Sequence, residues 1–137
     1  LDQFRSKYIG FIFQEAHLIK NLTLMENIKL AQSLAGKKGD KKGIHEVLEQ
    51  LQLDRKSNVY PSELSRGQLQ RAAIARSVIN KPALLIADEP TASLDDNNTH
   101  RVLKLLLSIA DTAGSTLLIT THDKRIKDQF SKTYLLK

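Results

Sequence analysis

The chain of 137 residues has no cysteine, no tryptophan and no long apolar run. Without cysteine it can form neither a disulfide framework nor a thiolate metal site, which is compatible with a reducing compartment. The longest apolar runs, at 83–87 and 117–119, are far shorter than the roughly 20 residues that cross a bilayer. We therefore expect a cytoplasmic chain without a membrane-spanning segment.

A phosphate-binding sequence of the form Gly-x-x-x-x-Gly-Lys-Ser/Thr is also absent. Such a loop places backbone N–H groups and a lysine around the β- and γ-phosphates of a nucleotide. The segment 36–43 (GKKGDKKG) does not replace it, because Lys41 rather than glycine stands five residues after Gly36. Its three glycines and four lysines predict a mobile surface loop instead.

What is present favours one domain with an anionic partner. Hydrophobic residues make up 41% of the chain, enough for a single core, and 21 Lys and Arg against 15 Asp and Glu give a net charge of +6. The amino end (LDQFRSK) has neither an initiating Met nor a targeting pattern, and residues 133–137 resemble a strand without a following turn. We expect both ends to be cut from a longer protein.

Short apolar runs predict parallel strands. Residues 8–13 (YIGFIF) form an aromatic and β-branched run, and residues 83–87 and 116–120 are apolar on both alternating faces, as in strands buried on both sides. A helix that stops near Gly114 separates the last two runs. This succession predicts a right-handed parallel crossover and therefore an α/β fold.

Helices are predicted by caps and by apolar residues three or four positions apart. Thr23 and Glu26 form a capping box for the first helix, a second follows the lysine-rich segment, a third begins near Ser65, and a fourth is capped by Asp95 or Asp96. The apolar faces comprise Leu24, Ile28, Ala31 and Leu34; Ile44, Val47, Leu48 and Leu51; Leu69, Ala72, Ala73 and the stem of Arg76; and Val102, Leu105, Leu106 and Ile109.

The sequence LSRGQ at 64–68 opens the third helix with small and polar residues. The first N–H groups of a helix are unpaired and carry partial positive charge, so an oxyanion is stabilised there. Gly67 permits a close approach of the anion, and Ser65 and Gln68 add side-chain donors. The alternative is that Ser65 is only an N-cap, and the motif by itself favours that alternative.

Two carboxylates, Asp88 and Glu89, follow the apolar run 83–87. Ligands of open parallel sheets bind at the carboxyl ends of the strands. One carboxylate could hold Mg²⁺ through its water shell while its neighbour polarises an attacking water. The alternative, equally weighted for the pair alone, is a loop that merely exposes two charges.

Two further candidates also follow predicted strands. His122 can donate to a phosphate or hydrogen-bond a reacting water, and Gln14 could reach a metal-bound water. Taken singly, each is more often an ordinary strand-end residue. The lysines of segment 36–43 are expected to be solvated rather than bound to nucleic acid or lipid headgroups, because no aromatics for base stacking are interleaved with them.

The order of these motifs is more informative than any one of them. Gln14, LSRGQ, LLIADEP, SLD at 93–95 and TTHD around His122 follow one another at spacings that strongly resemble the nucleotide-binding domain of ABC transporters. The resemblance covers nearly the whole chain. Within that family, GFIFQEAHLIKNLTLMENI and DEPTASLD look most like the ATPases of lipoprotein release, macrolide export and antimicrobial-peptide transport.

The resemblance implies a fold as well as a function. It implies an α/β, P-loop NTPase-like parallel-sheet core with an inserted α-helical subdomain, truncated at the N-terminus. The chain would be a single partial domain, with core portions at 1–14 and 80–137, the helical subdomain at 15–64 and the signature helix at 65–79. Because the missing part would cover the sheet, we expect an uncovered apolar face and a marginally stable or self-associating chain.

The resemblance also implies a role for each candidate residue. The catalytic group consists of Glu89 as general base, His122 as the sensor of the γ-phosphate, and Gln14, which would also contact the Mg²⁺ held by Asp88. The group that closes over ATP on a second subunit, or communicates across the dimer, consists of Ser65, Gly67, Gln68 and Asp95. Arg66 departs from the family, which usually has Gly at that position.

The implied cofactors are ATP and Mg²⁺, and the implied partners are a second nucleotide-binding subunit, arranged head to tail, and a transmembrane permease subunit. No nucleic acid is expected. The parent protein would be an ATPase on the inner face of the cell membrane, whereas this chain alone would be inactive without a phosphate-binding loop.

Three alternatives compete with a transporter subunit. Chromosome-maintenance ATPases share the motifs, but only fifty positions separate Gln14 from Leu64, too few for their long coiled coil. Ribosome-associated ATPases of the family typically have Asn-His where this chain has Ala92 and Ser93. A regulatory module without its own phosphate-binding loop, which would complete a partner's ATP site, stays open.

Overall fold

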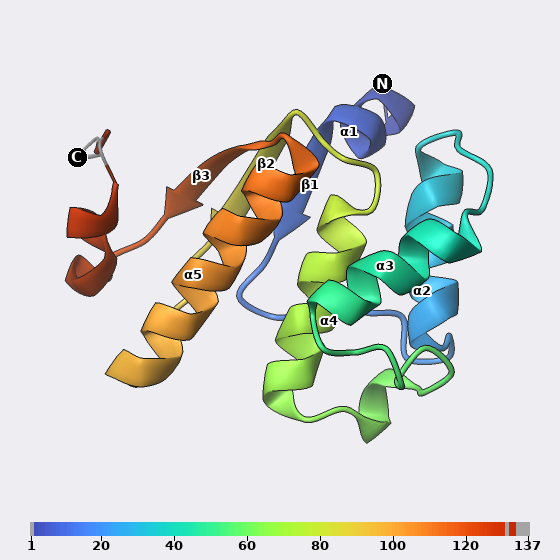
Figure 1. Cartoon of the computed structure of the whole chain (residues 1–137), viewed down its shortest axis with the longest axis horizontal. Helices are drawn as coiled ribbons and strands as arrows, with labels where there is room; N and C mark the ends of the chain where they lie inside the picture. Colours follow the sequence, from blue (N-terminus) through green and yellow to red (C-terminus); the bar gives the residue numbers. More distant parts are fainter. Residues whose placement is uncertain (1, 131, 134–137) are drawn as a thin grey trace.

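The computed structural model describes residues 2–130, 132 and 133. Three parallel strands lie side by side in the order β1 (Ile9–Ile12), β2 (Leu84–Asp88) and β3 (Thr116–Thr120) (Figure 1). The central position expected for residues 83–87 is confirmed. Of the strand expected at 133–137, residues 134–137 lie outside the described residues.

One long helix, α5 (Asp96–Ala113), joins β2 to β3 and makes the predicted parallel crossover. Asp95 is its N-cap, because the side chain accepts a hydrogen bond from the Asn98 amide. Gly114 ends it in the left-handed conformation at φ 70°, which glycine adopts without a Cβ clash. The cap and the stop predicted for this helix are both confirmed.

The other helices are α1 (Asp2–Tyr8), α2 (Leu24–Leu34), α3 (Lys41–Gln50) and α4 (Arg66–Val78), with short 3₁₀ turns at η1 (Pro61–Glu63) and η2 (Lys124–Gln129). Thr23 and Glu26 form the predicted capping box of α2 through reciprocal hydrogen bonds of 3.0 and 3.2 Å. In Figure 1, α2 and α3 lie together on the side of α4 away from α5.

The expectation for the amino end is wrong in one respect. Residues 2–8 form α1, and the strand expected from Tyr8 begins only at Ile9. Asp2 in the first turn and Lys7 in the last complement the helix dipole, and the rings of Phe4 and Tyr8, four residues apart, lie 4.7 Å from each other.

The lysine-rich segment 36–43 also differs from the predicted loop. Asp40 caps α3 by accepting from the Gly43 amide, so the last three residues of the segment are helical. Lys37 is anchored, because its ammonium group donates to the carbonyl of Asn80 at 2.8 Å. Burial, reinforced by the nearby charges of Lys7 and Lys81, lowers the pKa of Lys37.

One face of the sheet is covered by helices α4 and α5. The apolar core on this face joins Ile12, Leu85 and Ala87, all almost fully buried, to side chains of both helices. Gly10 belongs to the same face, and a Cβ there would lie 2.3 Å from the carbonyl oxygen of Ser77 on α4. Glycine at this position therefore allows the helix and the strand to approach closely.

The opposite face carries an uncovered apolar row. Phe11, Ile86 and Leu118 are paired in register across the three strands, and Phe11 and Leu118 remain 42% and 47% exposed. The expectation that residues 116–120 are buried on both faces is therefore wrong, since β3 is at the edge of the described sheet and alternates between half-buried and exposed residues. The expectation of an uncovered apolar face is confirmed.

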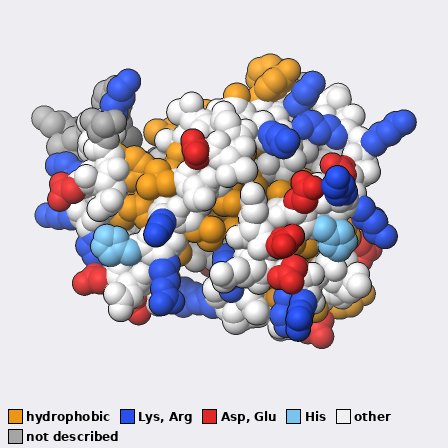
Figure 2. Space-filling model, viewed as in Figure 1, with side chains coloured by type: hydrophobic (Ala, Val, Ile, Leu, Met, Phe, Trp, Pro, Cys, Tyr) orange, Lys and Arg blue, Asp and Glu red, His pale blue; other side chains and the backbone are white. Residues whose placement is uncertain are grey.

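Figure 2 shows the helical side of the molecule. Hydrophobic side chains gather around β3 and the neighbouring side of α5, and Lys and Arg side chains are scattered over the outer helices. On this face the Lys and Arg side chains form no single large basic surface.

Candidate functional site

The carboxyl ends of β2 and β3 bring three predicted site residues together. Thr120 donates from its hydroxyl to Oδ1 of Asp88 at 2.7 Å. Glu89 accepts twice, from the hydroxyl of Thr121 at 3.0 Å and from the backbone amide of His122 at 3.0 Å. The adjacent parallel strands therefore fix both carboxylates against the segment that carries the histidine.

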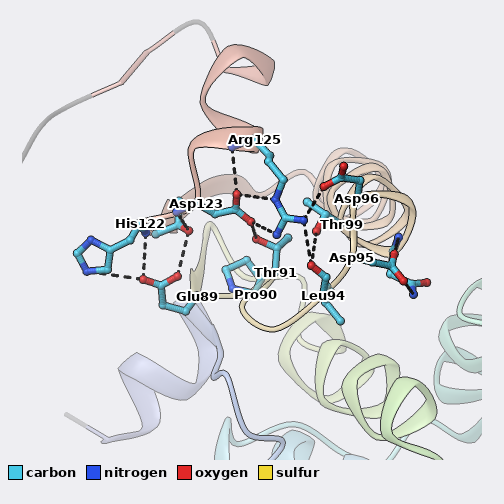
Figure 3. A network of polar contacts seen from close by, with 12 residues as sticks. Glu89, Pro90, Thr91, Leu94, Asp95, Asp96, Thr99, His122, Asp123 and Arg125 are labelled. Carbon is cyan, nitrogen blue, oxygen red and sulfur yellow. Dashed lines mark hydrogen bonds and ion pairs between the residues drawn. The ribbon is translucent and has the colours of Figure 1, made fainter.

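Glu89 has an unusual backbone, with φ at 47° in a residue that is not glycine. Its amide continues the sheet by donating to the Thr120 carbonyl at 2.8 Å. The imidazole of His122 is fully exposed, and its Nε2 lies 3.9 Å from Oε1 of Glu89 (Figure 3). The His122 imidazole can therefore contact a ligand, and it lies beside the Glu89 carboxylate, whose orientation is already fixed.

A cleft of about 930 Å³ opens next to this carboxylate. Gln14 and Gly67 line it together with Glu89, although they come from the loop after β1 and the first turn of α4. Nothing in the described part of the chain would touch a Cβ placed on Gly67, so the backbone there is open to an approaching group. The cleft therefore unites three of the predicted site residues.

The start of α4 shows Ser65 as an N-cap. Its hydroxyl oxygen accepts from the Gln68 amide at 3.2 Å, and Oε1 of Gln68 accepts from the Ser65 amide at 2.9 Å. This capping box uses acceptor atoms only. It leaves the hydroxyl hydrogen of Ser65 and the side-chain NH₂ of Gln68 able to donate to an anion, so the capping role and the anion-binding role are compatible.

Helix α4 also holds the loops on both sides of the cleft. Arg76 donates to the carbonyl oxygens of Ala16 and His17 at 2.7 and 2.8 Å, which fixes the loop that begins at Gln14. Gln70 donates to the carbonyl of Pro90, next to Glu89, at 2.7 Å. Burial lowers the pKa of the Arg76 guanidinium, which nevertheless stays charged.

A polar network surrounds the turn from Pro90 to Asp95 (Figure 3). Asp123 receives a hydrogen bond from the buried hydroxyl of Thr91 at 2.8 Å and a forked pair from Arg125 at 2.7 and 2.9 Å. The bonds from Arg125, followed by the bond from Thr91, hold the pKa of Asp123 well below its usual range. In return, Asp123 and then Asp96 raise the pKa of Arg125.

Asp95 lies at the edge of this network rather than beside Glu89. Its two carboxylate oxygens receive the backbone and side-chain N–H groups of Asn98 at 2.8 and 3.1 Å, within its own helix. Ser65, Gln68, Asp88, Asp95 and His122 do not line the cleft that Gln14, Gly67 and Glu89 share. Gln14, Gly67 and Glu89 thus form a cleft group, and Asp88, Glu89 and His122 form a strand-end group, so Glu89 belongs to both. The remaining candidates, Ser65, Gln68 and Asp95, lie at the starts of α4 and α5.

The sequence analysis missed the residues that orient these groups. Thr91 and Asp123 stand within the motifs DEPTASLD and TTHD but were given no role, because Thr91 meets Asp123 only when β2 and β3 pair. Arg125 lies outside these motifs. The sequence predicted only that the aliphatic stem of Arg76 packs in the core. Its guanidinium also fixes a loop sixty residues away by donating to the Ala16 carbonyl. Thr121 could have been suspected from its place directly before His122.

No group of three or more His, Asp or Glu side chains that could by itself hold a metal ion occurs within residues 2–130, 132 and 133. Over the same residues, no helix has the length and hydropathy needed to cross a bilayer.

The parallel sheet, the carboxylates at its strand ends and the open helix start define the class of P-loop NTPase-like α/β cores. The chain belongs to the ABC transporter family, whose model matches residues 2–92.

Curated relatives agree with this assignment. The chain is 41% identical to the lipoprotein-releasing system ATP-binding protein LolD of Treponema denticola over 138 residues, covering 99% of this chain and 61% of that protein. It is 41% identical to LolD of Rickettsia prowazekii, covering 97% of this chain and 61% of that protein. The chain therefore spans about three fifths of the length of these relatives.

Solved structures extend the likeness to three dimensions. A dimeric ATP-binding cassette, MJ0796, in a post-hydrolysis state bound to ADP and Pi, is 35% identical with a TM-score of 0.74, over 88% of this chain and 55% of that one. The cbiO1 protein of Clostridium perfringens, part of the ABC transporter complex cbiONQ, is 29% identical with a TM-score of 0.77, over 88% of this chain and 49% of that one.

Proposed function

We propose that this chain forms part of an ATP-binding subunit of an ABC transporter and that Glu89 is the general base for ATP hydrolysis. The observation that carries the proposal is the position of Glu89. It directly follows the central parallel strand β2, is oriented by Thr121 and His122, and lines the same cleft as Gln14 and Gly67. An oriented carboxylate beside an open cleft is suited to take a proton from an attacking water.

Magnesium fits this strand-end group as a partner of the nucleotide. Mg²⁺ keeps several waters and takes one or two carboxylates together with phosphate oxygens, and Asp88 offers one exposed carboxylate whose orientation Thr120 fixes. We propose Asp88 and Gln14 as the residues that would hold the ion. Bound there, it would neutralise charge on the phosphates.

The start of α4 would bind the γ-phosphate of an ATP molecule carried by a second subunit. Ser65, Gly67 and Gln68 present free donors and an unobstructed backbone to that phosphate. Asp95 would contact the same partner, and His122 would sense the phosphate. Two of the similar structures are dimeric cassettes, and one of them is bound to ADP and Pi, which supports a second subunit as the partner.

The chain alone is proposed to lack ATPase activity, because its 137 residues contain no phosphate-binding loop. The domain division follows the same reasoning: a sheet core at 1–14 and 80–137, a helical subdomain at 15–64 and a signature helix at 65–79. The parent subunit would lie in the cytoplasm, on the inner face of the membrane and against a permease. By likeness to the LolD proteins, its transport step would be lipoprotein release.

The test uses a chimera in which the Treponema denticola relative supplies the part of the cassette that this chain does not match. We expect the chimera to hydrolyse ATP and Glu89→Gln to lower kcat by about 10²–10⁴-fold, the usual contribution of a general base. Glu46→Gln, an exposed change on α3, is the control and should leave kcat unchanged. Full activity of Glu89→Gln would refute the assignment.

A further inference from the structure

Arg125 contacts two turns that are distant in the sequence. Within η2, it forks onto Asp123, with Nε 2.9 Å from Oδ1 and Nη2 2.7 Å from Oδ2. Its third nitrogen, Nη1, donates to the carbonyl of Leu94 and to Oδ1 of Asp96, both at 2.9 Å (Figure 3). The guanidinium therefore bridges the turn before α5 and the turn after β3.

The contact to Asp123 is a firm anchor. The Asp123 side chain is only 11% exposed, against 85% for Asp96, so solvent screens the first ion pair much less than the second. A forked guanidinium–carboxylate pair is strong and directional. The fully buried Thr91 donates to Oδ2, the oxygen that also accepts from Nη2 of Arg125, so Asp123 has little freedom to turn.

The bridged turn is conformationally strained. Glu89 and Ser93, neither of them glycine, have φ values of 47° and 66°. Left-handed residues other than glycine are strained and persist only where the surroundings enforce them. The bonds of Arg125 to Leu94 and of Thr91 to Asp123 lie directly around this turn and supply that constraint.

We propose that Arg125 is a positioning residue that locks the turn carrying Asp95 to the turn carrying His122, so that the two turns move as one unit. Leu94 precedes Asp95, and Asp123 follows His122, so each end of the bridge is one residue from a proposed site residue. The role of the two turns in ATP hydrolysis rests on the proposed function, whereas the Arg125 bridge between them does not depend on it. In a cassette dimer, contact of Asp95 with a partner would thereby reach His122.

The experiment measures the distance between the two turns in the full chain. Because the chain has no cysteine, Ser93→Cys and Lys124→Cys place two spin labels uniquely, both at exposed positions. Double electron–electron resonance should give one narrow distribution of label-to-label distances in the doubly labelled chain that keeps Arg125. The distribution should be broad after Arg125→Ala or Arg125→Gln. Arg125→Lys keeps the charge but not the planar fork, so it should also broaden the distribution.

The control is Lys127→Ala, which removes an exposed charge from the same 3₁₀ turn and should leave the distribution narrow. Circular dichroism melts of each variant distinguish a local loss of order from global unfolding. A narrow distribution in a folded Arg125→Ala or Arg125→Gln chain would overturn the inference, as would equal broadening by Lys127→Ala. Neither readout requires ATP hydrolysis, so failure of the proposed function would be recognised separately.

Discussion

The helical region, residues 24–64, and the sheet differ in how completely the chain buries them. In the helical region, Ile28, Ile44 and Leu48 are fully buried in the apolar core. In the sheet, one face is equally well covered, whereas the other leaves Phe11 and Leu118 nearly half exposed. The difference teaches that stability is concentrated in the helices and the covered face, while the open face and the strand ends are available for other contacts.

The largest expected effect comes from making the same substitution in both regions. Leu48→Ala opens a cavity in the helical core and should lower the free energy of unfolding by about 2–5 kcal/mol. Leu118→Ala removes a half-exposed side chain from the open face and should change it by no more than about 0.5 kcal/mol. Urea denaturation of both variants measures the two changes in unfolding free energy. Equal losses would contradict the proposed difference in burial between the helical core and the open face.

A buried polar residue sharpens the description of the helical region. Asn27 is 2% exposed, and its side chain accepts from the Ile19 amide and donates to the carbonyls of Ile19, Leu22 and Thr23. Asn27→Ala would remove these part-buried bonds and leave the Ile19 amide and the Leu22 carbonyl without their Asn27 partner, which should cost about 1–3 kcal/mol. The exposed Asn58→Ala is the matched control in the same denaturation assay. A cost no greater than that of the control would show that solvent replaces these bonds.

The strand-end region should respond to acid through Asp123. Since the folded-state pKa is depressed from the ordinary value of 3.8, the stabilisation is complete above that value and is lost as the pH falls through the lower folded pKa. Asp123→Asn should therefore flatten the loss of stability below about pH 4. Thermal melts between neutral pH and strong acid measure the slope, with Asp54→Asn as the exposed control. An unchanged slope would contradict the depressed pKa.

Substitutions on the open face should change self-association of the chain more than its folding stability. Leu118→Lys interrupts the row that joins Phe11, Ile86 and Leu118, with little change in unfolding free energy. We expect it to raise the concentration at which the chain stays monomeric in sedimentation velocity. Leu34→Lys, on α2, also replaces an exposed leucine and should have no such effect. Equal behaviour of the two variants would show that charge alone, not the row, controls association.

Much of the fold could be predicted because local signals and tertiary structure agree. The capping box of Thr23 and Glu26, the Asp95 cap and the Gly114 stop each specify a helix end through bonds within a few residues. The apolar run at 83–87 predicted a central strand, and the pairing of β2 with β1 on one side and β3 on the other confirms that position.

The errors arose where neighbours decide the outcome. Apolar alternation in 116–120 suggested burial on both faces, but only the covering helices determine which face is buried, and they cover one. The first turn of α3 was predicted as a loop because glycine and lysine dominate its sequence, whereas the Asp40 cap makes these residues helical. In the candidate site, the strand-end residues were predictable from motif order, whereas Arg76 and Arg125 act through distant carbonyls that leave no local pattern.

The central claim, that this chain completes an ATP site rather than forming one alone, is tested most directly by titration calorimetry with Mg-ATP. The chain and the chimera with the Treponema denticola relative would be compared under the same conditions. We predict saturable heat for the chimera and none for the chain alone. Binding by the chain alone as tight as by the chimera would contradict the claim, because the phosphates would then be held by residues already present in these 137.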